Sequence, residues 1–163
     1  MNIFYLDTCP IKSARMMTNK HVVKMIVESA QLLSTAHHVL DGASAMQNIY
    51  KKTHSNHPCA VWVRESVKNY EWLCEHLNAL LTEYGARYNK RPNDHATFVV
   101  YERLKTPPVN IPRVDMTPFR IAISNKACIV KNDVVLSYRN YYVADKLKTD
   151  DDKKRYDYLL TSC

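Results

Sequence analysis

A long amphipathic segment, residues 19–40, constrains the fold of this chain more than any other feature of the sequence. Its apolar side chains recur at helical spacing and share one face, which a helix must bury against another element. That face consists of Val22, Val23, Ile26, Ala30 and Leu33. Gly42 follows shortly after and suits the left-handed residue that commonly ends a helix. We therefore predict an α-helix over residues 19–40.

A second apolar stripe of helical period covers residues 61–88. It consists of Trp62, Val67, Tyr70, Leu73, Leu77, Leu80, Leu81 and Tyr84. Only 2 glycines occur in 163 residues, fewer than strand-rich folds usually need for their turns. The sequence therefore predicts an all-α fold, with a single compact domain over residues 1–163 built from a few long helices and extended loops.

Prolines divide the rest of the chain into shorter elements. Pro10 suits the first turn of a short helix. Three closely spaced prolines, beginning at Pro107, interrupt regular structure, so residues 105–117 are predicted to form an extended surface loop. The tail from about residue 147 is rich in Lys, Asp and Arg, and we expect it to be loosely packed. Shorter helices are predicted at residues 95–104, 119–124 and 133–142.

The chain is basic, with a formal net charge of +7 and an isoelectric point of about 9.1. Such an excess of positive charge favours a polyanionic partner such as a nucleic acid, although a solvated basic surface has the same composition. No apolar run is long enough to cross a bilayer, so no membrane partner is expected.

Five widely spaced cysteines include no CxxC pair, which argues against a disulfide framework and against a zinc ribbon. They are Cys9, Cys59, Cys74, Cys128 and Cys163. No signal peptide is predicted, because the apolar start of the chain is short and Asp7 follows it. These features favour a reducing, intracellular location.

One strip of the first predicted helix, away from its apolar face, carries polar groups that suit catalysis. The strip consists of His21, Lys24, Glu28, Gln31 and Thr35. It combines a titratable ring, a cation and a carboxylate within a few helical turns. A solvated face with a Lys24–Glu28 ion pair explains the same spacing. A metal site would need more ligands than one His and one Glu.

A second candidate segment, Ser137-Tyr138-Arg139-Asn140-Tyr141-Tyr142, interleaves tyrosines with an arginine. Such a segment suits contact with the sugar-phosphate backbone and stacking on bases. Tyrosines also pack in protein cores, so the same pattern fits a segment in which two of the three are buried.

Three segments of the chain together resemble the pyrimidine-dimer DNA glycosylases, the endonuclease V family of phages and algal viruses. The first is the apolar start MNIFYL, and the second is NKHVVKMIVE, residues 19–28, where a Lys-His pair precedes Glu28 at the family's spacing. The third is IAIS, residues 121–124, followed after sixteen residues by Tyr141-Tyr142. The order and spacing of these segments are similar to those of the family over most of the chain, as in a divergent member.

The resemblance implies a DNA repair enzyme, a glycosylase with AP-lyase activity on damaged duplex DNA that uses no metal or other cofactor. Family members attack C1′ of the damaged nucleotide with the α-amine at the chain start, which here belongs to Met1. The ordinary pKa of an α-amine, about 7.7–8.0, leaves a useful fraction neutral at physiological pH. Glu28 would assist the reaction, and His21 would line the same pocket.

The resemblance also implies a basic and aromatic surface for the duplex, on a protein that acts as a monomer. We expect the phosphates to contact Lys20, Lys24, Arg113, Arg120 and Arg139. The side chains expected to press against the lesion or the kinked duplex are Tyr138, Tyr141 and Tyr142. A viral source would place the protein in the cytoplasm or nucleus of a host.

Two positions depart from the family. Val27 stands where the family has an arginine before its catalytic Glu, and Met1 is followed by Asn2 rather than by a small residue that permits removal of methionine. Two other functions fit the same residues. One is a non-catalytic DNA-binding protein of the same fold, and the other is a metal-dependent nucleotide-processing enzyme that uses His21 and Glu28.

Overall fold

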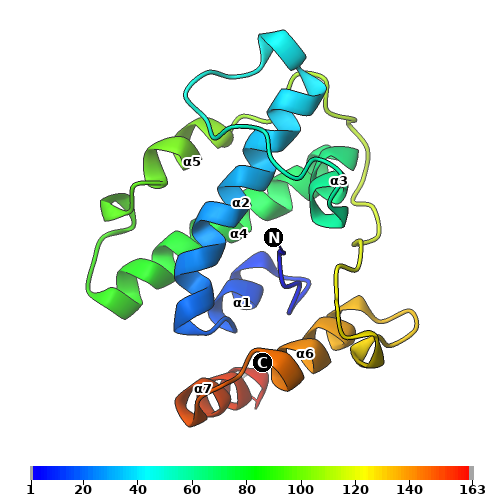
Figure 1. The fold of residues 1–163 in the computed structure, drawn as a ribbon. Coiled ribbons are helices and arrows are strands. Elements are labelled where there is room, and N and C mark those ends of the chain that lie inside the picture. The colour runs from blue at the N-terminus through cyan, green and yellow to red at the C-terminus, as the bar shows by residue number, and fades with distance from the viewer. Residues whose placement is uncertain (1, 162–163) are drawn as a thin grey trace.

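The computed structural model describes residues 2–161, and this part of the chain contains α-helices and no β-strand, as predicted. None of the described helices is both long enough and apolar enough to cross a membrane. Short 3-10 turns lie between some of the helices (Figure 1). The α-helices are α1 (Pro10–Arg15), α2 (Asn19–Leu40), α3 (Pro58–Glu65), α4 (Val67–Tyr88), α5 (Phe98–Leu104), α6 (Val134–Asp145) and α7 (Asp150–Thr161).

Helix α2 has the bounds that its apolar period predicts. The Thr18 side chain caps its first turn by accepting a hydrogen bond from His21 N at 3.3 Å. Gly42, just beyond its end, adopts a φ of +55°, a region that glycine enters without the steric cost of a side chain. The buried face of α2 packs on α4, and α1 packs on α4 as well, so α4 is the common partner of α1 and α2 (Figure 1).

The prediction of one helix over residues 61–88 is wrong at a single position, Ser66, which separates α3 from α4. Ser66 is extended, with φ −155° and ψ 144°. Its hydroxyl accepts a hydrogen bond from Lys68 N at 3.0 Å and donates one to Val114 O at 2.6 Å. Apolar residues of the predicted stripe are buried on both sides of the break, Trp62 in α3 and Val67 in α4 among them.

Residues 105–117 form no helix or strand, as predicted, whereas the helix predicted at residues 119–124 is absent and that stretch is extended. Thr117 holds the loop of residues 105–117 to α3 and α4. The Thr117 carbonyl accepts a hydrogen bond from Trp62 Nε1 at 3.1 Å, and the Thr117 N–H donates one to Asn69 Oδ1 at 3.0 Å. An extended backbone leaves the carbonyl groups of residues 119–124 available to other parts of the chain.

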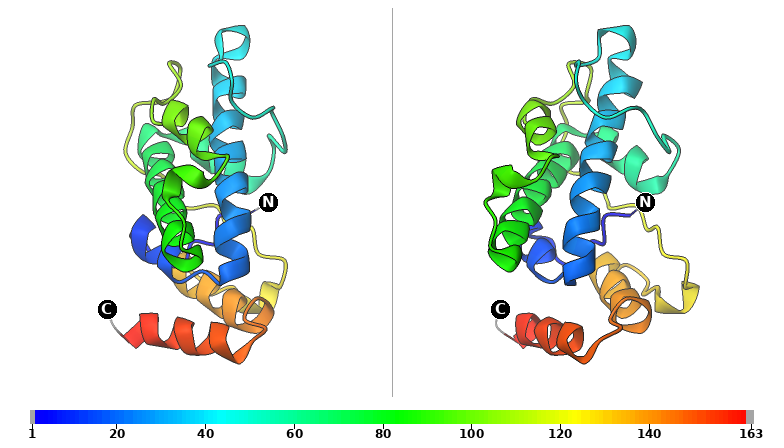
Figure 2. Two further views of the ribbon diagram at one scale, coloured as in Figure 1. Left: turned by 90° about the vertical axis from the view of Figure 1, so that its left-hand side faces the viewer. Right: turned by 60° about the vertical axis from the view of Figure 1, so that its left-hand side comes forward.

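The C-terminal helices lie at one end of the molecule, beside the start of α2 (Figure 2). Tyr142 of α6 makes this contact, because its hydroxyl accepts a hydrogen bond from Thr18 N at 2.9 Å and lies 2.7 Å from His21 Nδ1. The expectation of a loosely packed tail stays a prediction, although one side chain of α7 is buried against α6. Tyr156 is 1% exposed and stacks on Tyr142, with ring centroids 5.8 Å apart.

The N-terminal segment, residues 2–6, runs through the middle of this arrangement (Figure 1). Ile3 and Leu6 have no exposed surface. The segment therefore belongs to the hydrophobic core, and its burial determines where the start of the chain emerges.

Candidate active site

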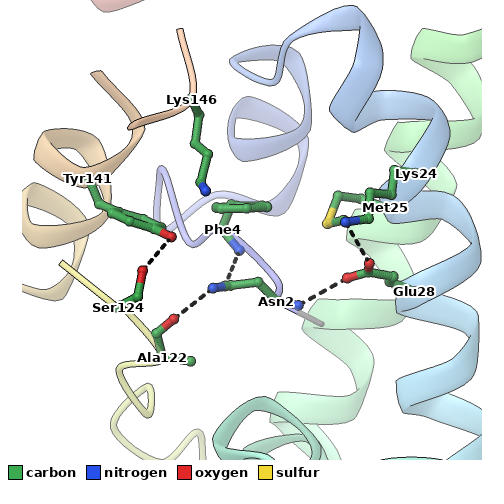
Figure 3. A pocket seen from close by; sticks show the side chains of 9 residues that line it. All are labelled: Asn2, Phe4, Lys24, Met25, Glu28, Ala122, Ser124, Tyr141 and Lys146. Atoms are coloured by element: carbon green, nitrogen blue, oxygen red, sulfur yellow. Dashed lines mark hydrogen bonds and ion pairs between the residues drawn. The ribbon is translucent and has the colours of Figure 1, made fainter. Parts of the chain in front are cut away.

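A pocket of about 250 Å³ opens where the N-terminal segment, α2, the extended stretch after Pro118 and α6 meet. Figure 3 shows Glu28 and Lys24 on one wall, Tyr141 and Ser124 on the opposite wall, and Asn2 between them. The lining residues are Asn2, Phe4, Lys24, Met25, Glu28, Ala122, Ser124, Tyr141 and Lys146. The pocket thus joins residues that are as far apart in the sequence as Asn2 and Lys146.

Glu28 is the carboxylate of this pocket. Its side chain is 14% exposed, and its Oε2 accepts a hydrogen bond from Asn2 N at 3.1 Å. Its Oε1 lies 3.3 Å from Lys24 Nζ one helical turn earlier, and the Lys24 side chain is 59% exposed. The ion pair expected from the spacing is therefore present, and it stands at the edge of a pocket rather than on a flat helix face.

His21 is not among the residues that line the pocket, and it packs against Phe4, which is one of them. Its ring stacks on Phe4, with centroids 4.7 Å apart and an interplanar angle of 19°. Burial first, and then the positive charges of Lys146, Lys24 and Lys20, lower the pKa of His21 to about 4.

The His21 ring is also tied to α6. Its Nδ1 lies 2.7 Å from the Tyr142 hydroxyl, which accepts a hydrogen bond from Thr18 N at 2.9 Å. We conclude that His21 supports the Phe4 side of the pocket as a neutral ring.

The wall opposite Glu28 carries a tyrosine and a lysine. The Tyr141 hydroxyl lies 3.0 Å from Ser124 Oγ, and Lys146 Nζ lies 4.7 Å from the centre of the Tyr141 ring. Lys146 has no ion-pair partner among the residues that the structure describes. Sequence reasoning missed Lys146, because it follows the last turn of α6 and matches no motif.

All three tyrosines that were predicted to contact DNA are buried in the protein alone. Tyr138 and Tyr142 have no exposed surface, and Ala122 N donates a hydrogen bond to the Tyr138 hydroxyl at 2.9 Å. Burial raises the pKa of Tyr142 to about 12. Tyr141 is 6% exposed and is the one of the three that lines the pocket.

The predicted basic contacts differ in their surroundings. Lys20, Lys24 and Arg113 are exposed, and Lys24 is paired with Glu28. Arg120 and Arg139 are also paired with acidic side chains of this chain. Arg120 forms an ion pair with Glu65, and its guanidinium lowers the pKa of that carboxyl.

Arg139 is anchored to the turn after the N-terminal segment. Its Nε donates a hydrogen bond to Leu6 O at 2.8 Å, and its Nη2 lies 3.0 Å from Asp7 Oδ2. The structure therefore gives Arg139 an internal role that its place in the aromatic-basic segment did not indicate.

Met1, the residue whose amine the resemblance implies as nucleophile, lies outside the described residues. Among the side chains that the structure describes, no three His, Cys, Asp or Glu residues are grouped to hold a metal ion.

The sequence model of the family described as pyrimidine dimer DNA glycosylase matches residues 1–96 of this chain. The match includes Asn2, Phe4, Lys24 and Glu28, and it ends before the wall formed by Ser124, Tyr141 and Lys146. No curated protein and no solved structure matches the chain.

Proposed function

The chain belongs to the pyrimidine dimer DNA glycosylase family, and from that premise we propose that it removes a damaged base from duplex DNA and then nicks the strand. The α-amine of Met1 attacks C1′, the glycosidic bond breaks, and the base leaves with the bonding electrons and a proton. The sugar ring opens to give an imine with the enzyme. Loss of a C2′ proton then expels the 3′ phosphate, and water releases the enzyme from the sugar fragment.

The observation that supports this proposal is the contact between the start of the chain and Glu28. Asn2 N lies 3.1 Å from Glu28 Oε2. One residue connects the two backbone nitrogens, and standard bond lengths keep the Met1 and Asn2 nitrogens within about 4 Å of each other in any conformation. In the proposed mechanism the α-amine would therefore stand close to the carboxylate.

A carboxylate at this place suits the reaction. Cleavage of the glycosidic bond develops positive charge on the sugar, and Glu28 would stabilise that charge from the wall of a partly enclosed pocket. The same carboxylate can accept a proton from the attacking amine and return it at a later step. Lys24 beside it carries a charge that suits a phosphate of the strand.

The duplex would reach this pocket with its damaged nucleotide displaced from the stack. Lys24 and Lys146 both line the pocket and would hold the phosphates that flank the sugar. Tyr141 would contact the sugar or the base with its pocket-facing edge. Lys20 and Arg113 are exposed and would contribute less specific contacts.

Borohydride trapping tests the proposal. The protein is mixed with a duplex that contains an abasic site or a pyrimidine dimer, the imine is reduced, and the adduct is digested and mapped by mass spectrometry. We expect a covalent adduct on the α-amine of Met1. Absence of an adduct would contradict the lyase step, and an adduct on Lys24 or Lys146 would contradict the choice of nucleophile. Salt-sensitive binding without product would favour a non-catalytic DNA-binding protein.

Replacement of the carboxylate gives a second test. Glu28→Gln should bind the duplex about as well as the unchanged protein and lose at least about 100-fold in turnover. Glu71→Gln is a matched control, because it makes the same change in charge at an exposed site on α4. Equal turnover of Glu28→Gln and the control would refute the role of Glu28.

A further inference from the structure

Asn2 connects three parts of the pocket (Figure 3). Its backbone N donates a hydrogen bond to Glu28 Oε2 on α2 at 3.1 Å. Its side-chain Nδ2 donates to Ala122 O on the extended stretch at 2.8 Å, and its Oδ1 accepts from Phe4 N at 3.0 Å. The three polar groups of Asn2 therefore bond to α2, to the extended stretch that contains Ala122 and to the N-terminal segment itself.

The backbone that follows Asn2 is held in an uncommon conformation. Phe4 has a φ of +54°, which a residue with a side chain adopts only when its surroundings require it. The bond from Phe4 N to Asn2 Oδ1 forms an Asx-type turn, and Leu6 N donates to Phe4 O at 2.8 Å. The Phe4 ring is fixed in addition by its stacking on His21.

These contacts hold the backbone N–H of Asn2 toward Glu28 Oε2. A peptide group is planar, so this bond restricts the peptide group to which that N–H belongs. In the proposed mechanism the attacking α-amine stands one residue before that N–H. Orientation of a nucleophile before the reaction removes entropy that would otherwise slow the chemical step.

We infer that Asn2 is a positioning residue, whose side chain holds the first peptide group so that the α-amine of residue 1 stays beside Glu28. This inference rests on the proposed amine mechanism and adds to it a residue that makes no contact with DNA in its assigned role. The carbonyl of Ala122 is the partner that matters most, because it ties the chain start to the wall opposite α2.

Two substitutions separate positioning from mere packing. Asn2→Ala keeps the backbone bond to Glu28 and removes both side-chain bonds. Asn2→Asp keeps an acceptor for Phe4 N, loses the donor to Ala122 O, and adds a negative charge close to the amine. That charge stabilises the protonated amine, so the amine becomes neutral only at higher pH.

Single-turnover borohydride trapping is the measurement, carried out across pH 6 to 10 with an abasic duplex and accompanied by binding and thermal unfolding. We expect Asn2→Ala to trap between about 10-fold and 100-fold more slowly, with a dissociation constant within about twofold of the unchanged protein. We expect Asn2→Asp to shift the midpoint of the pH profile upward. Asn140→Ala, an exposed asparagine on α6, is the control and should leave both readouts unchanged.

The outcomes are distinct. If the unchanged protein forms no adduct, the proposed function and this inference both fail. If it forms the adduct, and Asn2→Ala traps at the same rate or Asn2→Asp keeps the same pH midpoint, only the inference is overturned. The pH midpoint is a property of the folded molecules, so it remains informative for a variant that is partly unfolded.

Discussion

Removal of the charge of Arg139 and removal of the charge of Lys146 should affect different properties of the protein. Arg139 is anchored to Leu6 O at 2.8 Å and to Asp7 at 3.0 Å, with 30% of its side chain exposed. Lys146 has no such anchors and lines the pocket. We expect Arg139→Gln to affect stability and Lys146→Gln to affect binding of DNA.

The magnitudes follow from these contacts. Arg139→Gln loses a hydrogen bond to a carbonyl and a partly exposed ion pair, together about 1–2 kcal/mol in the free energy of unfolding. Lys146→Gln loses a cation–π contact with Tyr141 worth about 1 kcal/mol or less. One phosphate contact contributes about 0.9 to the slope of log affinity against log salt, so Lys146→Gln should lower that slope by about 0.9.

Both quantities are directly measurable. Urea unfolding gives the stability of each variant, and fluorescence anisotropy on a duplex with a non-cleavable abasic analogue gives the salt slope between about 50 and 200 mM. Over this range the unchanged protein should lose about 3.5-fold more affinity than Lys146→Gln. Lys68→Gln, which removes the same charge outside the pocket, is the control. A lower salt slope for Arg139→Gln together with an unchanged salt slope for Lys146→Gln would refute the assignment of the phosphate contact to Lys146.

Three further predictions concern stability. Tyr142→Phe leaves Thr18 N and His21 Nδ1 without their partner and should cost about 2 kcal/mol by urea unfolding, whereas a cost below about 0.5 kcal/mol would contradict the network. Burial lowers the pKa of His76 from 6.5 to about 4, so the free energy of unfolding should fall by up to about 3 kcal/mol as the pH falls from 6.5 to 4. His76→Gln should flatten the dependence of this free energy on pH over that range. An unchanged pH dependence in the variant would argue against a buried neutral ring. Ser66→Ala removes the cap of α4 and should lower stability by about 1–2 kcal/mol in the same assay, whereas no change would show that the helix start depends on other contacts.

Local sequence patterns were sufficient where a helix is long and one face is apolar. The bounds of α2 were predicted because the apolar period and Gly42 agree about where the helix runs and ends, and the structure adds the cap at Thr18. The break at Ser66 was missed because its cause, a bond to the distant Val114 carbonyl, is not a local property. The C-terminal helix α7 was missed because its composition is largely charged, and the contact of Tyr156 with Tyr142 of α6 is not a local property of the sequence.

The candidate site shows the same division. The Lys24–Glu28 pair follows from helical spacing, because residues one turn apart on a helix always share a face. The sequence could not indicate that Tyr138 and Tyr142 are buried while Tyr141, beside one of them, faces a pocket. Adjacent residues on a helix point about 100° apart, and which direction is the core depends on what α6 packs against.

The sequence by itself determined the helical class, the course of α2 and the residues that stand together on one strip of it, because these depend on contacts within a few positions of the chain. Only the tertiary structure decided that Asn2 lies against Glu28 and that Ala122, Tyr141 and Lys146 complete the pocket. Those residues are separated by up to about 140 positions, and burial of the N-terminal segment between α2 and the C-terminal region brings them together.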